Sequence, residues 1–289
     1  MADPAGKLAE RLVSAPYVRF VGAALDAIEP GRVRLRLAAR DDTGNRSGSL
    51  HGGVTASLLD VAGMVAAQSV PRDADDPRAS TIDLAVHYLA PAIGRGVVVD
   101  GVVTRRGREI VFVEATVTAD DGTKVARSVG VVRMGGADVP DPPPTASPCP
   151  IDATTPLEPR RSRSAFTARL GVQNALLAPG HAVLVLPNRP EIADVGDAIH
   201  EGALAAMVDA AGGAASWSVD GFDPRGRAAT IGMHLCFDAI PAGEDIVVEA
   251  RTSWRAGGIF LNTVMLTARS TGHPVATGSV TYRIVRPDA

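Results

Sequence analysis

Hydrophobic and polar positions along the chain follow two different periods. From Arg32 to Leu37 charged and apolar residues alternate, which predicts a strand with one face in water. From Gly53 to about Val70 the residues are apolar with Asp60 as almost the only charge, which predicts a buried helix. The chain then becomes rich in valine and is broken by glycine and by Asp-Gly turns. We therefore expect antiparallel strands near 79–90, 96–106, 109–120 and 123–134.

The same order of elements returns in the second half of the chain. The pattern predicts a helix over 200–217 and strands near 182–187, 227–239, 245–255, 258–270 and 274–285. Single residues recur as well, 149 positions later (from 51 to 200, for example): His51, Asp60 and Gly63 return as His200, Asp209 and Gly212. Chance does not readily keep such residues in one register, so we interpret the chain as an internal duplication.

A proline-rich segment separates the two repeats. It contains Pro142, Pro143 and Pro144, which fit neither a helix interior nor a central strand. We predict an N-terminal domain over 1–134, a semi-extended linker over 135–161 and a C-terminal domain over 162–289. A single repeat would expose an open sheet edge, so the two repeats are expected to pack together as one body.

Composition sets the class of protein. The chain has 289 residues, 46% of them hydrophobic, and a formal net charge of -3, which gives no basic face for nucleic acid. Cys149 and Cys236 lie far apart, so we expect no disulfide. Lys7 and Glu10 interrupt the apolar run that a signal peptide needs, and no stretch is apolar enough to span a membrane. The expected location is the cytoplasm.

The candidate chemistry starts from a carboxylate inside an apolar helix. Burying the charge of Asp60 is costly unless something compensates it, and Asp209 repeats the situation. Each carboxylate could simply accept hydrogen bonds and lock the fold. A helix that begins near Gly52, however, offers free N–H groups that can hold a carbonyl oxygen as it gains charge. Asp60, about two turns further on, could then act as a general base or as a nucleophile, with Thr81 holding the water or the carboxylate.

These residues together resemble a known family. The pattern Asn45-x5-His51-Gly52-Gly53-x6-Asp60, followed by Thr81-Ile-Asp-Leu-Ala-Val-His-Tyr-Leu-Ala-Pro, is similar to that of the PaaI-like hotdog thioesterases. The resemblance covers residues 30–134 and, more weakly, 180–285. It implies an α+β fold of two tandem hotdogs, each a long central helix wrapped by a curved antiparallel sheet, packed as a double hotdog.

The resemblance also implies a role for each residue of the pattern. The backbone N–H of Gly52 polarises the thioester carbonyl, Asp60 is the base or nucleophile, and Thr81 orients the water. Because the family builds each site from two hotdog units, two composite sites are expected. In one, Asn45, His51, Gly52 and Gly53 face Asp209 and Thr230; in the other, His200, Glu201 and Gly202 face Asp60 and Thr81.

The second repeat departs from the family pattern. Glu201 replaces the first glycine, and Asp194 stands where the first repeat has Asn45. A carboxylate of Glu201 turned inward would repel a developing oxyanion, so one of the two sites is expected to be weaker. Arg106, in an arginine-rich turn, and its counterpart Arg255 could meet the phosphates of coenzyme A, or could simply lie in solvated turns.

Several other kinds of site are not expected. The sequence has no Gly-x-Ser-x-Gly motif, and His200-Glu201 lacks the second histidine of a zinc protease motif. His234 and Cys236, two positions apart, could pair on one strand face as metal ligands; we interpret them instead as core packing, and we predict neither a metal nor a cofactor.

The resulting hypothesis is an acyl-CoA thioesterase, with an acyl-carrier-protein thioester as the other substrate class. Two alternatives stay open. One is an acyl-thioester hydratase or dehydratase that uses His51 or His87, and the other is an acyl-CoA-binding module without catalysis. We also expect that two double hotdogs can pair as a homodimer.

Overall fold

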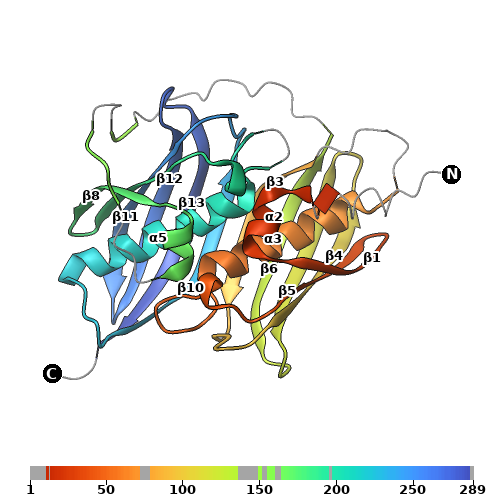
Figure 1. Cartoon of the computed structure of the whole chain (residues 1–289), viewed down its shortest axis with the longest axis horizontal. Helices are drawn as coiled ribbons and strands as arrows, with labels where there is room; N and C mark the ends of the chain where they lie inside the picture. Colours follow the sequence, from red (N-terminus) through yellow and green to blue (C-terminus); the bar gives the residue numbers. More distant parts are fainter. Residues whose placement is uncertain are drawn as a thin grey trace.

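The computed structural model describes residues 11–12, 14–71, 79–135, 149–151, 155–159, 164–194 and 197–286. Two long helices lie side by side against one large antiparallel sheet (Figure 1). The helices of the described part are α2 (Pro16–Val21), α3 (Gly52–Gln68), α4 (Ala165–Arg169) and α5 (Glu201–Asp220), with short 3-10 turns η1 (Asp41–Thr43) and η2 (Pro190–Ile192). The predicted central helices are therefore confirmed to within three residues at each end.

Within the described residues the sheet has 13 strands, and the two repeats meet at its centre. The order is β1-β2-β4-β5-β6-β3 for the first repeat and then β10-β13-β12-β11-β9-β8-β7 for the second. The strands of the first repeat are β1 (Ala24–Glu29), β2 (Arg32–Leu37), β3 (Ala79–Tyr88), β4 (Val97–Arg106), β5 (Ile110–Ala119) and β6 (Lys124–Met134). Those that follow are β7 (Glu158–Pro159), β8 (Gln173–Ala178), β9 (His181–Leu186), β10 (Arg227–Phe237), β11 (Ile246–Ala256), β12 (Ile259–Ala268) and β13 (Pro274–Val285).

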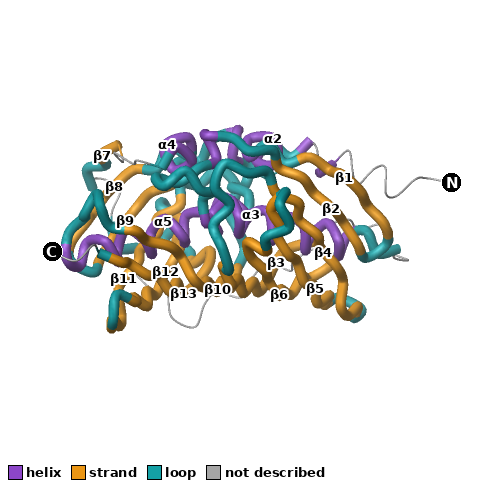
Figure 2. Tube along the Cα trace, turned by 90° about the horizontal axis from the view of Figure 1, so that it is seen from below, coloured by secondary structure: helices purple, strands orange, loops and turns teal. Residues whose placement is uncertain are grey.

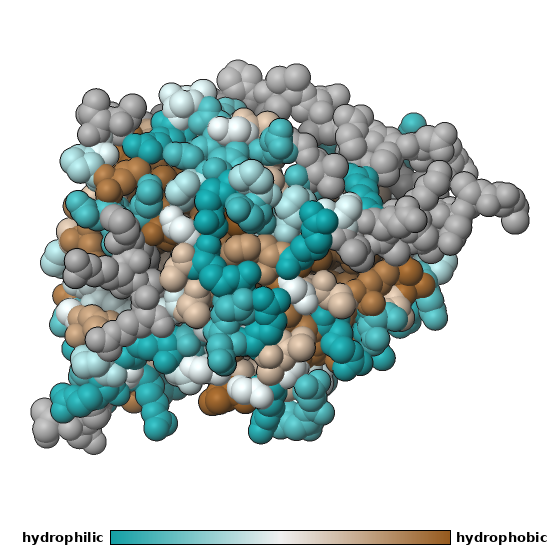
Figure 3. All heavy atoms as spheres, viewed as in Figure 1, coloured by the Kyte–Doolittle hydropathy of each residue, from teal (hydrophilic) through white to brown (hydrophobic). Residues whose placement is uncertain are grey.

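The sheet curves into a trough that holds both long helices, and α2 and α4 lie over its open side (Figure 2). Seen from that side, polar side chains cover much of the centre, and apolar groups gather in smaller patches between them (Figure 3). The core lies between helix and sheet, because strand residues alternate between the two faces: Val33, Leu35 and Leu37 of β2 are buried, whereas the arginines between them are exposed. This architecture confirms the predicted double hotdog fold.

The duplication extends further than the motif around the two histidines. Elements α2, β1, β2, η1 and α3 of the first repeat return as α4, β8, β9, η2 and α5, each beginning 149 residues later. The edge hairpins β1–β2 and β8–β9 and the short helices before them were not among the predicted elements, apart from the strands β2 and β9. The turn glycines Gly22 and Gly171 both have positive φ, so even the left-handed backbone at this point is repeated.

The predicted linker lies mostly outside the described residues. Of its described part, Ile151 packs against Val183, Val185 and Val247 on the outer face of the sheet. This contact explains why β9 is buried on both faces, in contrast to β2, its counterpart in the first repeat. The domain boundaries 1–134, 135–161 and 162–289 stay a prediction.

Candidate active site

The first turns of α3 and α5 pack closely against each other. A Cβ added to Gly53 would lie 2.5 Å from the Cα of Ala206, and one added to Gly202 would lie 3.0 Å from the Cβ of Ser57. Only glycine leaves room for this approach. The two glycines, which were predicted to line the substrate site, thus serve the contact between the helices. As a result, the start of each helix lies against the middle of the other.

Each helix is capped by its histidine. His51 Nδ1 accepts the N–H of Gly53 at 3.0 Å, and His200 Nδ1 accepts the N–H of Gly202 at 2.9 Å. The imidazole nitrogen that accepts this bond carries no proton, so the other ring nitrogen carries it in the neutral ring. Among the residues that the structure describes, the N–H groups of Gly52 and Glu201 have no acceptor. Each helix therefore presents one free donor at its first residue.

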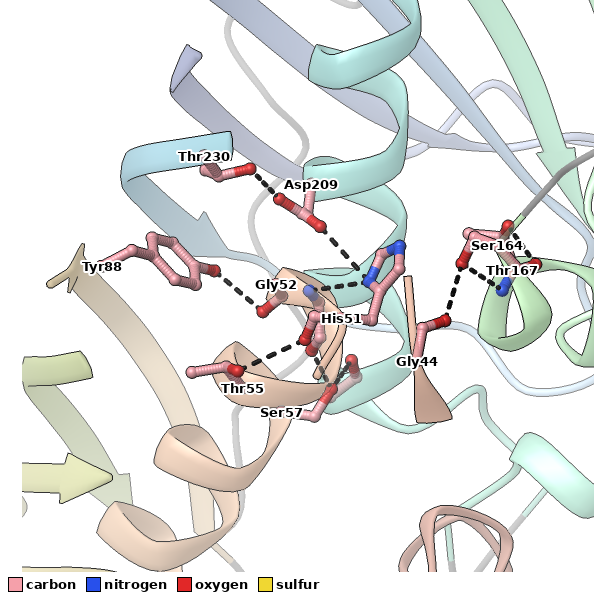
Figure 4. Close-up of polar contacts among 12 residues, drawn as sticks. Gly44, His51, Gly52, Thr55, Ser57, Tyr88, Ser164, Thr167, Asp209 and Thr230 are labelled. Atoms are coloured by element: carbon pink, nitrogen blue, oxygen red, sulfur yellow. Dashed lines mark hydrogen bonds and ion pairs between the residues drawn. The ribbon is translucent and has the colours of Figure 1, made fainter. Parts of the chain in front are cut away.

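The Gly52 site consists of His51, Gly52, Asp209 and Thr230 (Figure 4). A Cβ added to Gly52 would lie 2.9 Å from both carboxylate oxygens of Asp209. Asp209 Oδ2 also lies 3.4 Å from His51 Nδ1, and Thr230 donates its hydroxyl to Asp209 Oδ1. Because Nδ1 is the acceptor for Gly53, the contact between His51 and Asp209 is not an ion pair. A carboxylate of the second repeat thus lies beside the free helix end of the first.

Tyr88 supports the same helix end from the sheet. Its hydroxyl donates to the carbonyl of Gly52 at 3.0 Å (Figure 4). Burial, together with the charge of Asp209, raises the pKa of Tyr88 well above its usual value, so the phenol stays protonated and remains a donor. The counterpart in the second repeat is Phe237, which has no hydroxyl to give.

The Glu201 site consists of His200, Glu201, Asp60 and Thr81. Thr81 donates its hydroxyl to Asp60 Oδ1 at 2.7 Å and its backbone N–H to the carboxyl of Glu201, at 3.2 and 3.3 Å from the two oxygens. Asp60 Oδ2 is buried without a hydrogen-bond partner. The Glu201 side chain is therefore folded back beside Asp60, into the space that Gly52 leaves open in the other site.

Burial governs the protonation of the Glu201 site. Burial raises the pKa of Asp60 to about 7, although the hydrogen bond from Thr81 lowers it. The charge of Asp194 raises the pKa further by a smaller amount. Burial, followed by the charge of Asp60, raises the pKa of Glu201 well above its usual value, and burial lowers the pKa of His200. The site thus gathers two carboxyl groups, Asp60 and Glu201, in low dielectric, an unfavourable environment for a developing oxyanion.

A small pocket of about 70 Å³ opens beside the Glu201 site. Its walls include Asp194, His200 and Glu201 and, from α3, the larger side chains Val61, Met64 and Val65. At the positions 149 residues later, α5 carries Ala210, Gly213 and Ala214. The helix face beside Asp209 is therefore lined by smaller residues than the one beside Asp60.

Three of the residues predicted to bind substrate lie differently from the rest. The side-chain oxygen of Asn45 is turned into its own loop, where it accepts from the backbone N–H groups of Ser47 and Ser49. Arg255 pairs with Asp220, the last residue of α5, at 2.7 Å. Arg106 is exposed at the end of β4. Following the residues that pair across neighbouring strands leads from Arg106 over β5 and β6 to Thr81 on β3. The same path in the second repeat leads from Arg255 over β12 and β13 to Thr230 on β10. Each path spans three strand spacings, about 14 Å.

Several residues of the site were not found from the sequence. Tyr17 of the first repeat stacks on His200 with ring centroids 4.9 Å apart, and Phe166 of the second repeat packs on His51 at 5.5 Å. Tyr17 also bonds Ser57, whose hydroxyl donates to the carbonyl of Gly202 at 2.5 Å. Tyr17 and Phe166 are 149 residues apart, so the repeat itself was a signal that could have revealed them.

Both halves of the chain match sequence profiles of known families. The Thioesterase superfamily matches residues 47–126, and the Acyl-CoA thioesterase C-terminal domain matches residues 138–279. A provisionally named esterase of Halobacterium salinarum is 33% identical over 143 residues, which are 46% of this chain and 94% of that protein. Human acyl-coenzyme A thioesterase 13 is 31% identical over 90 residues, which are 31% of this chain and 62% of that protein.

The fold of the whole chain is also known from solved structures. A protein of Alicyclobacillus acidocaldarius described as having a hot dog fold is similar with a TM-score of 0.70 at 17% identity, and the match covers 92% of this chain and 97% of that one. At this identity the likeness concerns the fold alone. None of the helices that the structure describes is long and apolar enough to cross a membrane.

Proposed function

Because the chain belongs to the thioesterase superfamily, we propose that it hydrolyses acyl-CoA thioesters and does so chiefly at the Gly52 site. The family confirms the prediction of a thioester hydrolase; the substrate, the site and the mechanism are our proposal. The observation that carries it is the free N–H of Gly52 beside the carboxylate of Asp209, with no side chain between them. We also propose the PaaI-like group as the nearer relation, on the strength of the His-Gly-Gly…Asp pattern.

In this mechanism the thioester carbonyl oxygen accepts the N–H of Gly52, helped by the positive end of the dipole of α3. One such donor contributes roughly 3 kcal/mol to the stability of the oxyanion, about a hundredfold in rate. His51 holds the first turn in place through Gly53, and Tyr88 fixes the peptide that follows the donor. The donor is thus oriented before the substrate arrives, which lowers the cost of reorganisation.

Asp209 has two ways to complete the reaction. It can take a proton from water that attacks the carbonyl carbon, or it can attack that carbon itself and form an anhydride that water then opens. In both cases the thiolate of coenzyme A leaves and is protonated, and the products are a free acid and a thiol. Thr230, which donates to Asp209 Oδ1, keeps the other oxygen turned toward Gly52.

The test is the release of free thiol from a panel of acyl-CoA thioesters by the purified full chain. Hydrolysis of at least one member, with equal amounts of acid and thiol, supports the proposal. Hydration of an unsaturated acyl-CoA without thiol release would instead establish the hydratase alternative, and tight binding without turnover would establish the binding module. Acyl-carrier-protein thioesters in the same panel distinguish the two carriers.

A single-turnover reaction in water labelled with heavy oxygen separates the two routes of Asp209. If Asp209 is a base, the label enters the product acid in the first turnover. If Asp209 is a nucleophile and water opens the anhydride at the carboxyl carbon of Asp209, one of the unlabelled oxygens of Asp209 leaves with the product acid, and the label is found in the protein.

A further inference from the structure

A group of three potential metal ligands lies on the outer face of the sheet, on two strands that come from different repeats. Asp83 is on β3, and His234 and Cys236 are on β10. One ligand atom from each lies within 4.8 Å of the others. Their neighbours along the strands, such as Leu84 and Leu235, point to the core, so the three side chains face away from the helices. The interpretation of His234 and Cys236 as core packing was therefore wrong.

The strand register brings the three side chains together. Asp83 is directly opposite Cys236 across the seam between β3 and β10, and His234 is opposite Ala85. One oxygen of Asp83, Oδ2, lies 2.6 Å from His234 Nε2 and 3.6 Å from Cys236 Sγ. The side chains of His234 and Asp83 are 49% and 36% exposed, and Cys236 is exposed as well. An ion from solvent can thus reach all three.

We propose that Asp83, His234 and Cys236 bind a divalent transition metal, with zinc as the ion that fits them best. Imidazole, thiolate and carboxylate are the three ligand types that zinc takes in proteins, at about 2.0–2.3 Å from the metal. Ligand atoms on a tetrahedral zinc are therefore roughly 3.5 Å apart. The 3.6 Å between Cys236 Sγ and Asp83 Oδ2 matches this separation, whereas the 2.6 Å between His234 Nε2 and Asp83 Oδ2 has to lengthen when the ion binds. Three protein ligands leave a fourth position for water on the exposed side.

The arrangement does not suit a nucleophilic cysteine. In such a site the histidine lies between thiol and carboxylate and takes the proton of the thiol. Here the carboxylate lies between the other two, and His234 contacts Asp83. The cluster thus lacks an activated thiol but has a complete ligand set.

Charge balance also favours a dication. When zinc binds, the thiol of Cys236 releases its proton to solvent, and a carboxylate oxygen of Asp83 and a ring nitrogen of His234 each donate a lone pair to the ion. The thiolate and the carboxylate then offset the two positive charges of the ion. Because the ligands come from both repeats, the bound metal links β3 to β10 at the seam and is expected to stabilise the joined pair. This site is independent of the proposed thioesterase reaction, because it is on the opposite face of the sheet.

The test uses the full chain after treatment with a chelator, titrated with Co²⁺ alone and then with Zn²⁺ in competition. We expect one Co²⁺ per chain with a thiolate-to-cobalt charge-transfer band, displaced by one Zn²⁺. Cys236→Ser should abolish the band, and His234→Ala and Asp83→Asn should each weaken Zn²⁺ binding by at least about tenfold. The matched control is Cys149→Ser, which changes the other cysteine and should leave the band intact.

Stability gives a second readout that does not depend on a chromophore. Zn²⁺ should raise the unfolding temperature of the unmodified chain and of Cys149→Ser, but not that of Cys236→Ser. Cys236→Ser and His234→Ala change exposed side chains, Asp83→Asn and Cys149→Ser change half-buried ones, and all four variants are expected to keep the native circular dichroism spectrum. Absence of the band in the unmodified chain, or its persistence in Cys236→Ser, would overturn the proposal.

Discussion

The Gly52 site and the Glu201 site have the same arrangement of helix ends, aspartate and threonine, and they differ in the residue at the first position of the helix. In each, a capping histidine begins a long helix, an aspartate of the other helix lies beside that end, and a threonine hydroxyl holds the aspartate. The difference is the first residue of the helix. Gly52 leaves its N–H facing Asp209, whereas Glu201 places a second carboxyl beside Asp60.

The comparison indicates that the two repeats agree more closely in the residues that form the fold than in the residues that face the site. The glycines at the helix crossing, Gly53 and Gly202, are both present, because any side chain there would separate the helices. The residue before each of them faces the site and contributes nothing to the crossing. It can therefore change, and with it the reactivity of one site, while the fold remains.

The largest effect is expected from Asp209→Asn, which keeps the shape of the side chain and removes its charge. Loss of a general base or nucleophile should lower the rate of thiol release about 10²- to 10⁴-fold. The matched control is Asp60→Asn, which should leave most of the rate. Equal losses in the two variants, measured by steady-state thiol release, would mean that the two sites work equally.

A smaller loss is expected from Gly52→Ala. The new Cβ would lie 2.9 Å from both oxygens of Asp209 and would push the carboxylate away from the donor. A displacement of this size typically costs about 10²-fold in kcat. Glu201→Ala is the control, because it shortens the corresponding residue and should not lower the rate. An unchanged kcat for Gly52→Ala would show that the substrate carbonyl does not bind at this helix end.

The third prediction concerns the stability of the Glu201 site. Burial raises the pKa of Asp60 to about 7 in the folded chain, against an ordinary value of 3.8 for an aspartate. Between these values the folded state keeps a proton that the unfolded state has lost, so this group lowers stability as the pH rises from 4 to 7. Asp60→Asn removes this dependence. Its stability relative to the unmodified chain should increase by up to about 4 kcal/mol over that range, as measured by urea unfolding.

A constant difference between Asp60→Asn and the unmodified chain at every pH would contradict this prediction. It would mean that Asp60 is ionised in the folded chain throughout the range and that the burial of this carboxylate is fully compensated.

The smallest effect is expected from Tyr88→Phe. The change removes one hydrogen bond to the carbonyl of Gly52, worth about 1 kcal/mol, so kcat should fall less than about tenfold. The loss should appear in kcat more than in KM, because the tyrosine positions the donor and does not contact substrate in this mechanism. A loss as large as that of Asp209→Asn would give Tyr88 a direct part in the reaction.

Much of the fold could be predicted from the sequence because its signals are local. The two apolar helices, the valine-rich strands and their Asp-Gly turns gave element types and approximate bounds. The edge strands β1 and β8 were missed, since their exposed patterns carry weak hydrophobic periodicity. The return of Gly22 as Gly171 and of Tyr17 as Phe166 could have shown that the repeat includes these segments as well.

The candidate site could be predicted in part, through the spacing of His51, Gly52 and Asp60 and the family that it resembles. The folding back of Glu201 and the phenol of Tyr88 depend on tertiary contacts that no spacing reveals. The error at His234 and Cys236 was avoidable. They alternate with Met233, Leu235 and Phe237, which are buried, so the period of a strand places the pair on the outer face.

We propose that, among the differences between the two sites, the Glu201 side chain is the main cause of the lower activity at its own site. The most direct test is thiol release by the double variant Asp209→Asn with Glu201→Gly, compared with Asp209→Asn alone under the same conditions. The account predicts that removing the Glu201 side chain restores activity at least about tenfold over the single variant, because it frees the second helix end beside Asp60. If the double variant is no more active than Asp209→Asn, the difference between the sites has another cause and the account is wrong.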